Sequence, residues 1–129
     1  MQTLLKIPET YQHTSPAGAE VRLLMNSHLG GIAHCTLKAG KITLAVQHKT
    51  VSEFWHVLSG KGAIWRKMDG NNEEITPLET GTTIEIPVGA QFQYRSDAAA
   101  DLVFLCVTMP PWSGADEAKI VDQGAWTPT

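Results

Sequence analysis

Short apolar or alternating runs recur along the whole chain, and each run is ended by turn-forming residues. Alternation with a period of two is typical of β-strands, whose side chains point to opposite faces in turn. The predicted strands cover residues 20–25, 31–38, 42–48, 53–58, 62–68, 73–78, 82–86, 91–95 and 102–109. Turn residues separate them at 39–40, 59–60, 69–72, 80–81 and 87–89. Because no window shows a helical period, the pattern predicts an all-β antiparallel sandwich or barrel.

The 129 residues are enough for one domain with one core. We expect a barrel over about residues 20–109, an N-terminal arm at 1–19 and an irregular C-terminal strap at 110–129. The strap contains Trp112 and Trp126. These side chains are expected to pack onto the barrel or onto a partner subunit, and a simple cover over apolar surface is the favoured interpretation.

Charge and hydropathy narrow the class of protein. The formal net charge is −3 and the basic residues are scattered, so the sequence does not predict a nucleic-acid-binding protein. No apolar run approaches the roughly 18 residues of a membrane span, and the N-terminus does not resemble a signal peptide, so a cytoplasmic protein is expected. Cys35 and Cys106 lie far apart without a metal-type spacing, and both are expected to be reduced.

The stretch HKTVSEFWHVLSGKG, residues 48–62, carries the candidate chemistry. Strand periodicity places Leu44, Val46 and His48 on one face, and a bend at 50–52 then allows Glu53 to face His48. His56 falls on the opposite face from Glu53. A carboxylate among apolar residues needs a partner, either a metal ion or an imidazolium.

At this point the chain resembles the cupin superfamily. The first cupin motif contains two histidines, a glutamate and a glycine at fixed offsets. Here His48, Glu53 and Gly60 match it, and Val46 stands at the first histidine position. The resemblance implies an antiparallel double-stranded β-helix, also described as a jelly-roll barrel.

The second cupin motif begins with a glycine, five residues and P-x-G. Gly81 and residues 87–89 match this beginning, whereas Phe92 stands at the expected histidine and Ser96 at the expected asparagine. The chain is similar to small single-domain bacterial cupins in which the metal-ligand motifs are incomplete.

The resemblance implies a barrel cavity that binds a small molecule. Its expected lining is mostly apolar and aromatic, which is usual for such pockets. The expected lining residues are Leu44, Val46, His48, Glu53, Trp55, Phe92 and Tyr94.

Two kinds of chemistry remain open at this stage. His48 and Glu53 are candidate ligands of a weakly held divalent metal (Zn, Fe, Mn or Ni), with Gln91 or Gln93 as helpers. Without a metal, His48 is a candidate general base that Glu53 orients and stabilises in its charged form.

The function predicted is that of an enzyme of the isomerase, lyase or hydrolase type that acts on a small organic metabolite. The alternatives are a non-catalytic ligand-binding or sensing protein and an assembly protein. A homodimer is expected because Trp65, Trp112 and Trp126 would offer aromatic surface to a second subunit.

Overall fold

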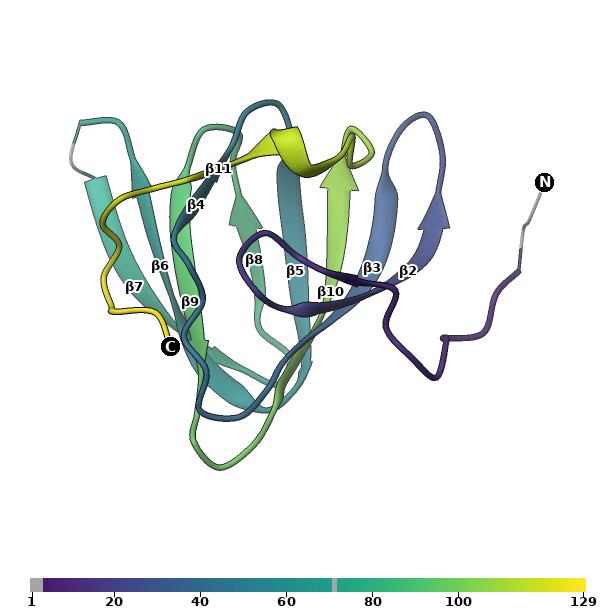
Figure 1. Cartoon of the computed structure of the whole chain (residues 1–129), viewed down its shortest axis with the longest axis horizontal. Helices are drawn as coiled ribbons and strands as arrows, with labels where there is room; N and C mark the ends of the chain where they lie inside the picture. The colour runs from purple at the N-terminus through teal and green to yellow at the C-terminus, as the bar shows by residue number, and fades with distance from the viewer. Residues whose placement is uncertain (1–3, 71) are drawn as a thin grey trace.

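The computed structural model describes residues 4–70 and 72–129. The first three residues of the expected arm and Asn71 of the expected turn at 69–72 lie outside the described residues. Figure 1 shows two packed β-sheets, an N-terminal arm that leaves the body, and a C-terminal segment that returns across one sheet.

The described residues form eleven strands in two sheets, and neighbouring strands pair antiparallel. The first sheet has the order β1 (His13–Thr14), β2 (Glu20–Asn26), β3 (Gly31–Leu37), β10 (Leu102–Met109), β5 (Ser52–Ser59) and β8 (Thr83–Ile86). The second has the order β11 (Ala118–Ile120), β4 (Val46–His48), β9 (Gln91–Ser96), β6 (Lys61–Met68) and β7 (Asn72–Glu79). The predicted all-β jelly-roll architecture is confirmed.

Each predicted strand has a counterpart within a few residues of its expected ends, but two short strands were not predicted. One is β1, and the other is β11, which follows a 3₁₀ turn, η1 (Ala115–Glu117). Because β11 pairs with β4, the C-terminal segment belongs in part to the second sheet and is not wholly irregular.

The predicted strand at 42–48 contains a β-bulge, which corrects one expectation about the site. Ile42 faces Arg95 and Val46 faces Phe92, so three residues on one strand oppose two on the other. The extra residue breaks the alternation. Leu44 is consequently 38% exposed, whereas Val46 is 1% exposed. Leu44 therefore does not continue the buried row of Val46.

Aromatic rings fill the space between the two sheets. Trp55 stacks on Phe104 with ring centroids 4.0 Å apart, and Tyr94 meets Trp55 edge-on at 4.8 Å. Phe92 also contacts Trp55 edge-on. These geometries suit aromatic pairs, and burial of four large rings supplies much of the apolar driving force for folding.

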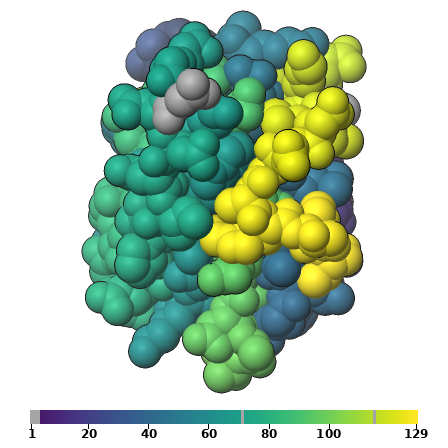
Figure 2. Space-filling view, turned by 90° about the vertical axis from the view of Figure 1, so that its left-hand side faces the viewer, coloured from purple at the N-terminus to yellow at the C-terminus, as the bar shows by residue number. Residues whose placement is uncertain are grey.

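The C-terminal segment covers the outer face of the five-stranded sheet. Figure 2 shows it in yellow, lying across the surface beside the middle strands. The buried Gln93 side chain binds the backbone N–H and carbonyl of Trp126, and the guanidinium of Arg95 lies 4.5 Å from the Trp126 ring centroid. Trp65 on this sheet is also buried, at 4% exposure.

No helix among the described residues is both long and apolar enough to cross a membrane.

Gly60 and Gly70 offer a matched test of why the first motif needs its glycine. Both have a φ of 84°, but a Cβ on Gly60 would collide with the Asp101 carbonyl, whereas one on Gly70 would meet nothing within 4 Å. We expect Gly70→Ala to cost about 1 kcal/mol for backbone strain alone and Gly60→Ala about 3 kcal/mol or more. Urea unfolding of both variants measures the difference. Equal losses would contradict the close approach of Gly60 to β10.

Candidate functional site

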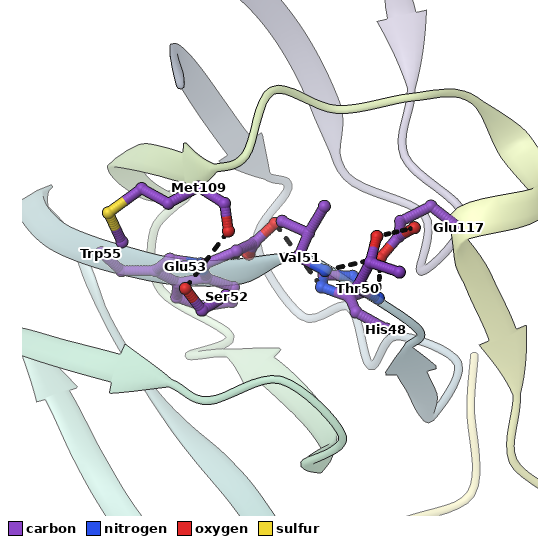
Figure 3. A network of polar contacts seen from close by, with 8 residues as sticks. All are labelled: His48, Thr50, Val51, Ser52, Glu53, Trp55, Met109 and Glu117. Carbon is purple, nitrogen blue, oxygen red and sulfur yellow. Dashed lines mark hydrogen bonds and ion pairs between the residues drawn. The ribbon is translucent and has the colours of Figure 1, made fainter. Parts of the chain in front are cut away.

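The candidate site lies where the chain crosses from the second sheet to the first. His48 ends β4 and Glu53 is the second residue of β5, so residues 49–51 form the corner between the sheets. Nδ1 of His48 lies 3.8 Å from Oε2 of Glu53, and both side chains are at most 8% exposed. Figure 3 shows the two groups facing each other beside the corner.

Glu53 is held in place by the indole of Trp55. Nε1 of Trp55 donates a 2.8 Å hydrogen bond to Oε1 of Glu53. The other carboxylate oxygen, Oε2, is therefore the one that faces His48. Burial, followed by the negative charge of Glu53, raises the pKa of both the Cys35 and the Cys106 thiols. Both cysteines are free and buried, so they present protonated thiols to the interior at neutral pH.

The His48 ring lies between two aromatic side chains. Phe92 meets it edge-on at 5.1 Å and Trp112 at 5.0 Å. Among the residues that the structure describes, Nδ1 of His48 has no hydrogen-bond partner. A buried polar atom without a partner is costly in a folded protein, and a catalytic role or a bound water is one explanation for it.

Glu117 also belongs to the site, although the sequence analysis did not identify it. Its side chain is 4% exposed. Oε1 accepts hydrogen bonds from the backbone N–H groups of Thr50 (2.6 Å) and Val51 (2.7 Å), and Oε2 accepts one from Oγ1 of Thr50 (2.8 Å). Glu117 therefore fixes the corner between His48 and Glu53, as Figure 3 shows.

Electrostatics keep Glu117 ionised. Burial by itself raises the pKa of this carboxyl, but the hydrogen bonds from Thr50 and Val51 and the proximity of His48 outweigh burial and lower the pKa below its ordinary value. No signal in the sequence could have found this residue, because it lies far along the chain from the corner and outside both motifs.

The expected lining residues other than Leu44 are buried, but they fill the interior. Val46, Trp55, Phe92 and Tyr94 are each at most 3% exposed, and the three rings pack against one another. Tyr94 is so enclosed that burial raises its pKa well above the ordinary value. Of the two rings that contact His48, Phe92 is buried and Trp112 is only partly buried.

A surface depression of about 500 Å³ lies at the other end of the barrel. Its lining includes Lys61, Pro77 and Arg95, and it does not reach His48.

The proposed metal helpers face away from the pair. Phe92 and Tyr94 point inward, so Gln91 and Gln93 lie on the outer face of β9. The Gln93 amide is occupied by the carbonyls of Thr43 and Trp126. This geometry gives no support to either glutamine as a metal helper.

The donor set does not fit a divalent metal in a site of three or four ligands. Val46 and Phe92 carry no metal-donor atoms. Both carboxylate oxygens of Glu117 already accept hydrogen bonds from Thr50 and Val51. Among the described residues, no group of three or more His, Cys, Asp or Glu side chains is arranged to hold a metal ion.

His56 is exposed, and its Nδ1 lies 2.7 Å from Oγ1 of Thr83 on the outer face of the first sheet. His34 also faces outward, paired between Arg22 and Leu105. Burial, and then the charge of Arg22, lower the pKa of His34. Neither histidine reaches the His48–Glu53 pair.

Residues 33–108 match the family model of the cupin domain, Cupin_2. The chain belongs to this family. A comparison with curated protein sequences finds no match.

Solved structures of low sequence identity share the cupin fold. PAC13 from Streptomyces, as a variant with uridine, has a TM-score of 0.73 at 10% identity over 94% of this chain and 92% of that chain. CapF, a capsular polysaccharide assembling protein from Staphylococcus aureus, has a TM-score of 0.71 at 16% identity over 81% of this chain, which spans only 32% of CapF. An uncharacterised double-stranded β-helix protein from Klebsiella pneumoniae has a TM-score of 0.71 at 13% identity over 95% of this chain and 100% of that chain.

Glu117 gives a prediction about acid stability. Because its pKa is lowered on folding, its contribution is complete above the unfolded value of 4.5 and is lost as the pH falls through the lower folded value. At pH 7 we expect Glu117→Gln to reduce the free energy of unfolding by roughly 1.5–3 kcal/mol, the range of charge-assisted hydrogen bonds. The difference in the free energy of unfolding between this variant and the unmodified protein should become smaller as the pH falls below 4.5.

Denaturant unfolding at a series of pH values measures this effect. Glu79→Gln is the control, because Glu79 is an exposed carboxylate at the far end of β7. If Glu117→Gln lowers the free energy of unfolding by the same amount at every pH, the charge of Glu117 does not stabilise the corner.

Proposed function

We propose that this cupin domain acts on a small organic molecule by proton transfer, with His48 as the acid–base group and Glu53 as its partner. One observation carries the proposal: a buried imidazole whose Nδ1 is 3.8 Å from a buried carboxylate and lacks a hydrogen-bond partner among the described residues. The reaction types that need such a pair are isomerisation, elimination and hydrolysis.

The surroundings of Glu53 support a role in stabilising charge. Trp55 fixes one carboxylate oxygen, so the other is directed at the imidazole at no further cost in side-chain freedom. When His48 takes up a proton, this oxygen lies beside the new positive charge in a region with few polar groups. Electrostatic stabilisation is stronger there than in water.

The position of Trp112 supports a site at the mouth of the barrel. The interior beyond His48 is filled by Phe92, Trp55 and Tyr94, whereas Trp112 belongs to the segment between β10 and η1. A ligand would approach His48 by displacing or stacking on Trp112. Planar, partly apolar molecules suit such a surface.

One neighbour guides the choice of probes. Pac13, described as a nucleoside dehydratase, has a TM-score of 0.69 at 13% identity, over 92% of both chains. A cupin of similar length can thus carry an elimination reaction. Nucleosides therefore belong in a first set of test compounds, together with small hydroxy acids and sugars.

The second candidate function is that of a binding or sensing protein without turnover. The tightly packed interior favours this alternative, because it leaves little space for substrate rearrangement. An enzyme would convert the compound that it binds, whereas a binding or sensing protein would release it unchanged.

We also propose a homodimer, but not through the tryptophans. Trp65 is buried, Trp112 packs on His48 and Trp126 lies under Arg95 within the same chain. A second subunit therefore has to use other surface.

A ligand screen followed by a turnover assay tests the acid–base proposal. Compounds that raise the melting temperature are incubated with the protein and monitored by NMR for consumption. We expect His48→Gln to lower kcat by roughly 10²–10⁴-fold and Glu53→Gln to lower it by a smaller factor. His56→Gln is the matched control, because His56 faces outward and should leave kcat unchanged.

Three outcomes have distinct meanings. Turnover that survives His48→Gln would overturn the assignment of His48. A bound compound that is never consumed would favour the binding protein. A loss of activity in His56→Gln equal to that in His48→Gln would indicate a general effect on folding.

A further inference from the structure

The two sheets differ in how their outer faces are covered. The C-terminal segment lies over the five-stranded sheet through Gln93 and Trp126. On the six-stranded sheet, side chains of the outer face remain open to solvent: Phe54 is 45% exposed, Leu58 39% and Met25 38%. An apolar face of this kind on a folded domain indicates an interaction surface.

Outward-facing side chains, apolar except for the last, form a continuous row across this sheet. The strand registers place one outward residue of each of five neighbouring strands side by side. Cross-strand neighbours of this kind lie about 5 Å apart, so the side chains touch. The row consists of Met25, Ile32, Val107, Phe54 and Glu85.

The next row on the same face is basic at one edge. The registers place Arg22, His34, Leu105 and His56 side by side. Arg22 lies on β2 at one edge of the face, whereas Glu85 lies on β8 at the other. The face therefore carries Arg22 at one edge and Glu85 at the other, and Glu20, the next outward residue of β2, also lies at the Arg22 edge.

We propose that this outer face of the six-stranded sheet binds a second copy of the chain, face to face, with a two-fold axis along β10. The inference rests on the homodimer proposed above and assigns its surface and symmetry. In the strand order β2-β3-β10-β5-β8, β10 is central, so this axis stacks β2 of one copy on β8 of the other. Arg22 then lies near Glu85 of the second copy, and Val107 lies near the axis.

The size of the face agrees with this occupant. At ordinary strand spacings, β2, β3, β10, β5 and β8 present roughly 450 Å² of plane area. A standard interface buries about 800 Å² of accessible surface on each partner, and corrugated side-chain surface exceeds its plane area. The arm adds to the face, because Arg22 binds the carbonyls of Pro8 and Glu9 and so holds the arm at this edge, with Ile7 52% exposed.

Sedimentation equilibrium of two matched variants tests the surface. Phe54→Lys places a charge in the apolar row, and Ile75→Lys makes the same kind of change at a 56% exposed residue of the five-stranded sheet. We expect the unmodified chain and Ile75→Lys to be dimers. Phe54→Lys should weaken the dimer by at least about thirtyfold, as loss of a central aromatic anchor does. Both lysines replace exposed residues, and circular dichroism of each variant tests whether it folds.

A charge exchange tests the symmetry. Glu85→Arg should weaken the dimer because it then faces Arg22 of the second copy, and Arg22→Glu together with Glu85→Arg should restore it. Failure of this restoration overturns the two-fold along β10. A dimer that is insensitive to Phe54→Lys overturns the face but not the homodimer, and an unmodified chain that is monomeric at high micromolar concentration overturns both. None of these results bears on the acid–base proposal, which is read from turnover.

Discussion

The geometry of the candidate site depends on one buried carboxylate. Glu117 satisfies two backbone N–H groups and one hydroxyl at the corner where the chain leaves one sheet for the other. Without it, these backbone donors would be buried without a partner, which a folded protein rarely tolerates. Because His48 stands immediately before the corner and Glu53 two residues after it, the hydrogen bonds of Glu117 constrain the distance between them. The C-terminal segment is therefore a structural part of the site.

Aromatic packing fills most of the barrel interior and leaves the His48–Glu53 pair at its edge. Phe92 stands at a position where the cupin motif has a histidine, and its ring contacts both His48 and Trp55. Val46 replaces the other histidine and is buried. Space and donor atoms that would surround a bound metal are thus replaced by apolar contacts. The remaining polar pair lies at the edge of the packed interior, where the His48 ring contacts the partly buried Trp112.

The chain covers the outer face of one sheet with its own C-terminal segment and leaves apolar side chains exposed on the outer face of the other. Trp126, Gln93 and Arg95 join the C-terminal segment to the five-stranded sheet. At the centre of the six-stranded face, apolar side chains such as Phe54 remain exposed. Three tryptophans that looked like interface residues in the sequence are used inside the chain. Whether an apolar side chain packs within its own chain or offers an interaction surface is decided by its exposure after folding and not by its residue type.

Much of the fold could be predicted from the sequence, because the period of two and the turn residues are local properties. Gly60 shows this best: its spacing from Glu53 identified the family, and its φ of 84° beside the Asp101 carbonyl explains why glycine is needed. The facing of His48 and Glu53 also followed from periodicity, since only a short bend separates them.

What the sequence could not determine depended on contacts between distant residues. A single extra residue opposite β9 removed Leu44 from the inner face, and no local signal marks such a bulge. Gln93 looked like a metal helper until Trp126, far along the chain, was found to occupy its amide. Glu117 could be recognised only when folding had placed it against Thr50 and Val51. The sequence by itself determined the barrel and its polar pair, whereas the tertiary structure decided which residues surround that pair, because hydrogen bonds and packing across the sheets are set by spatial proximity.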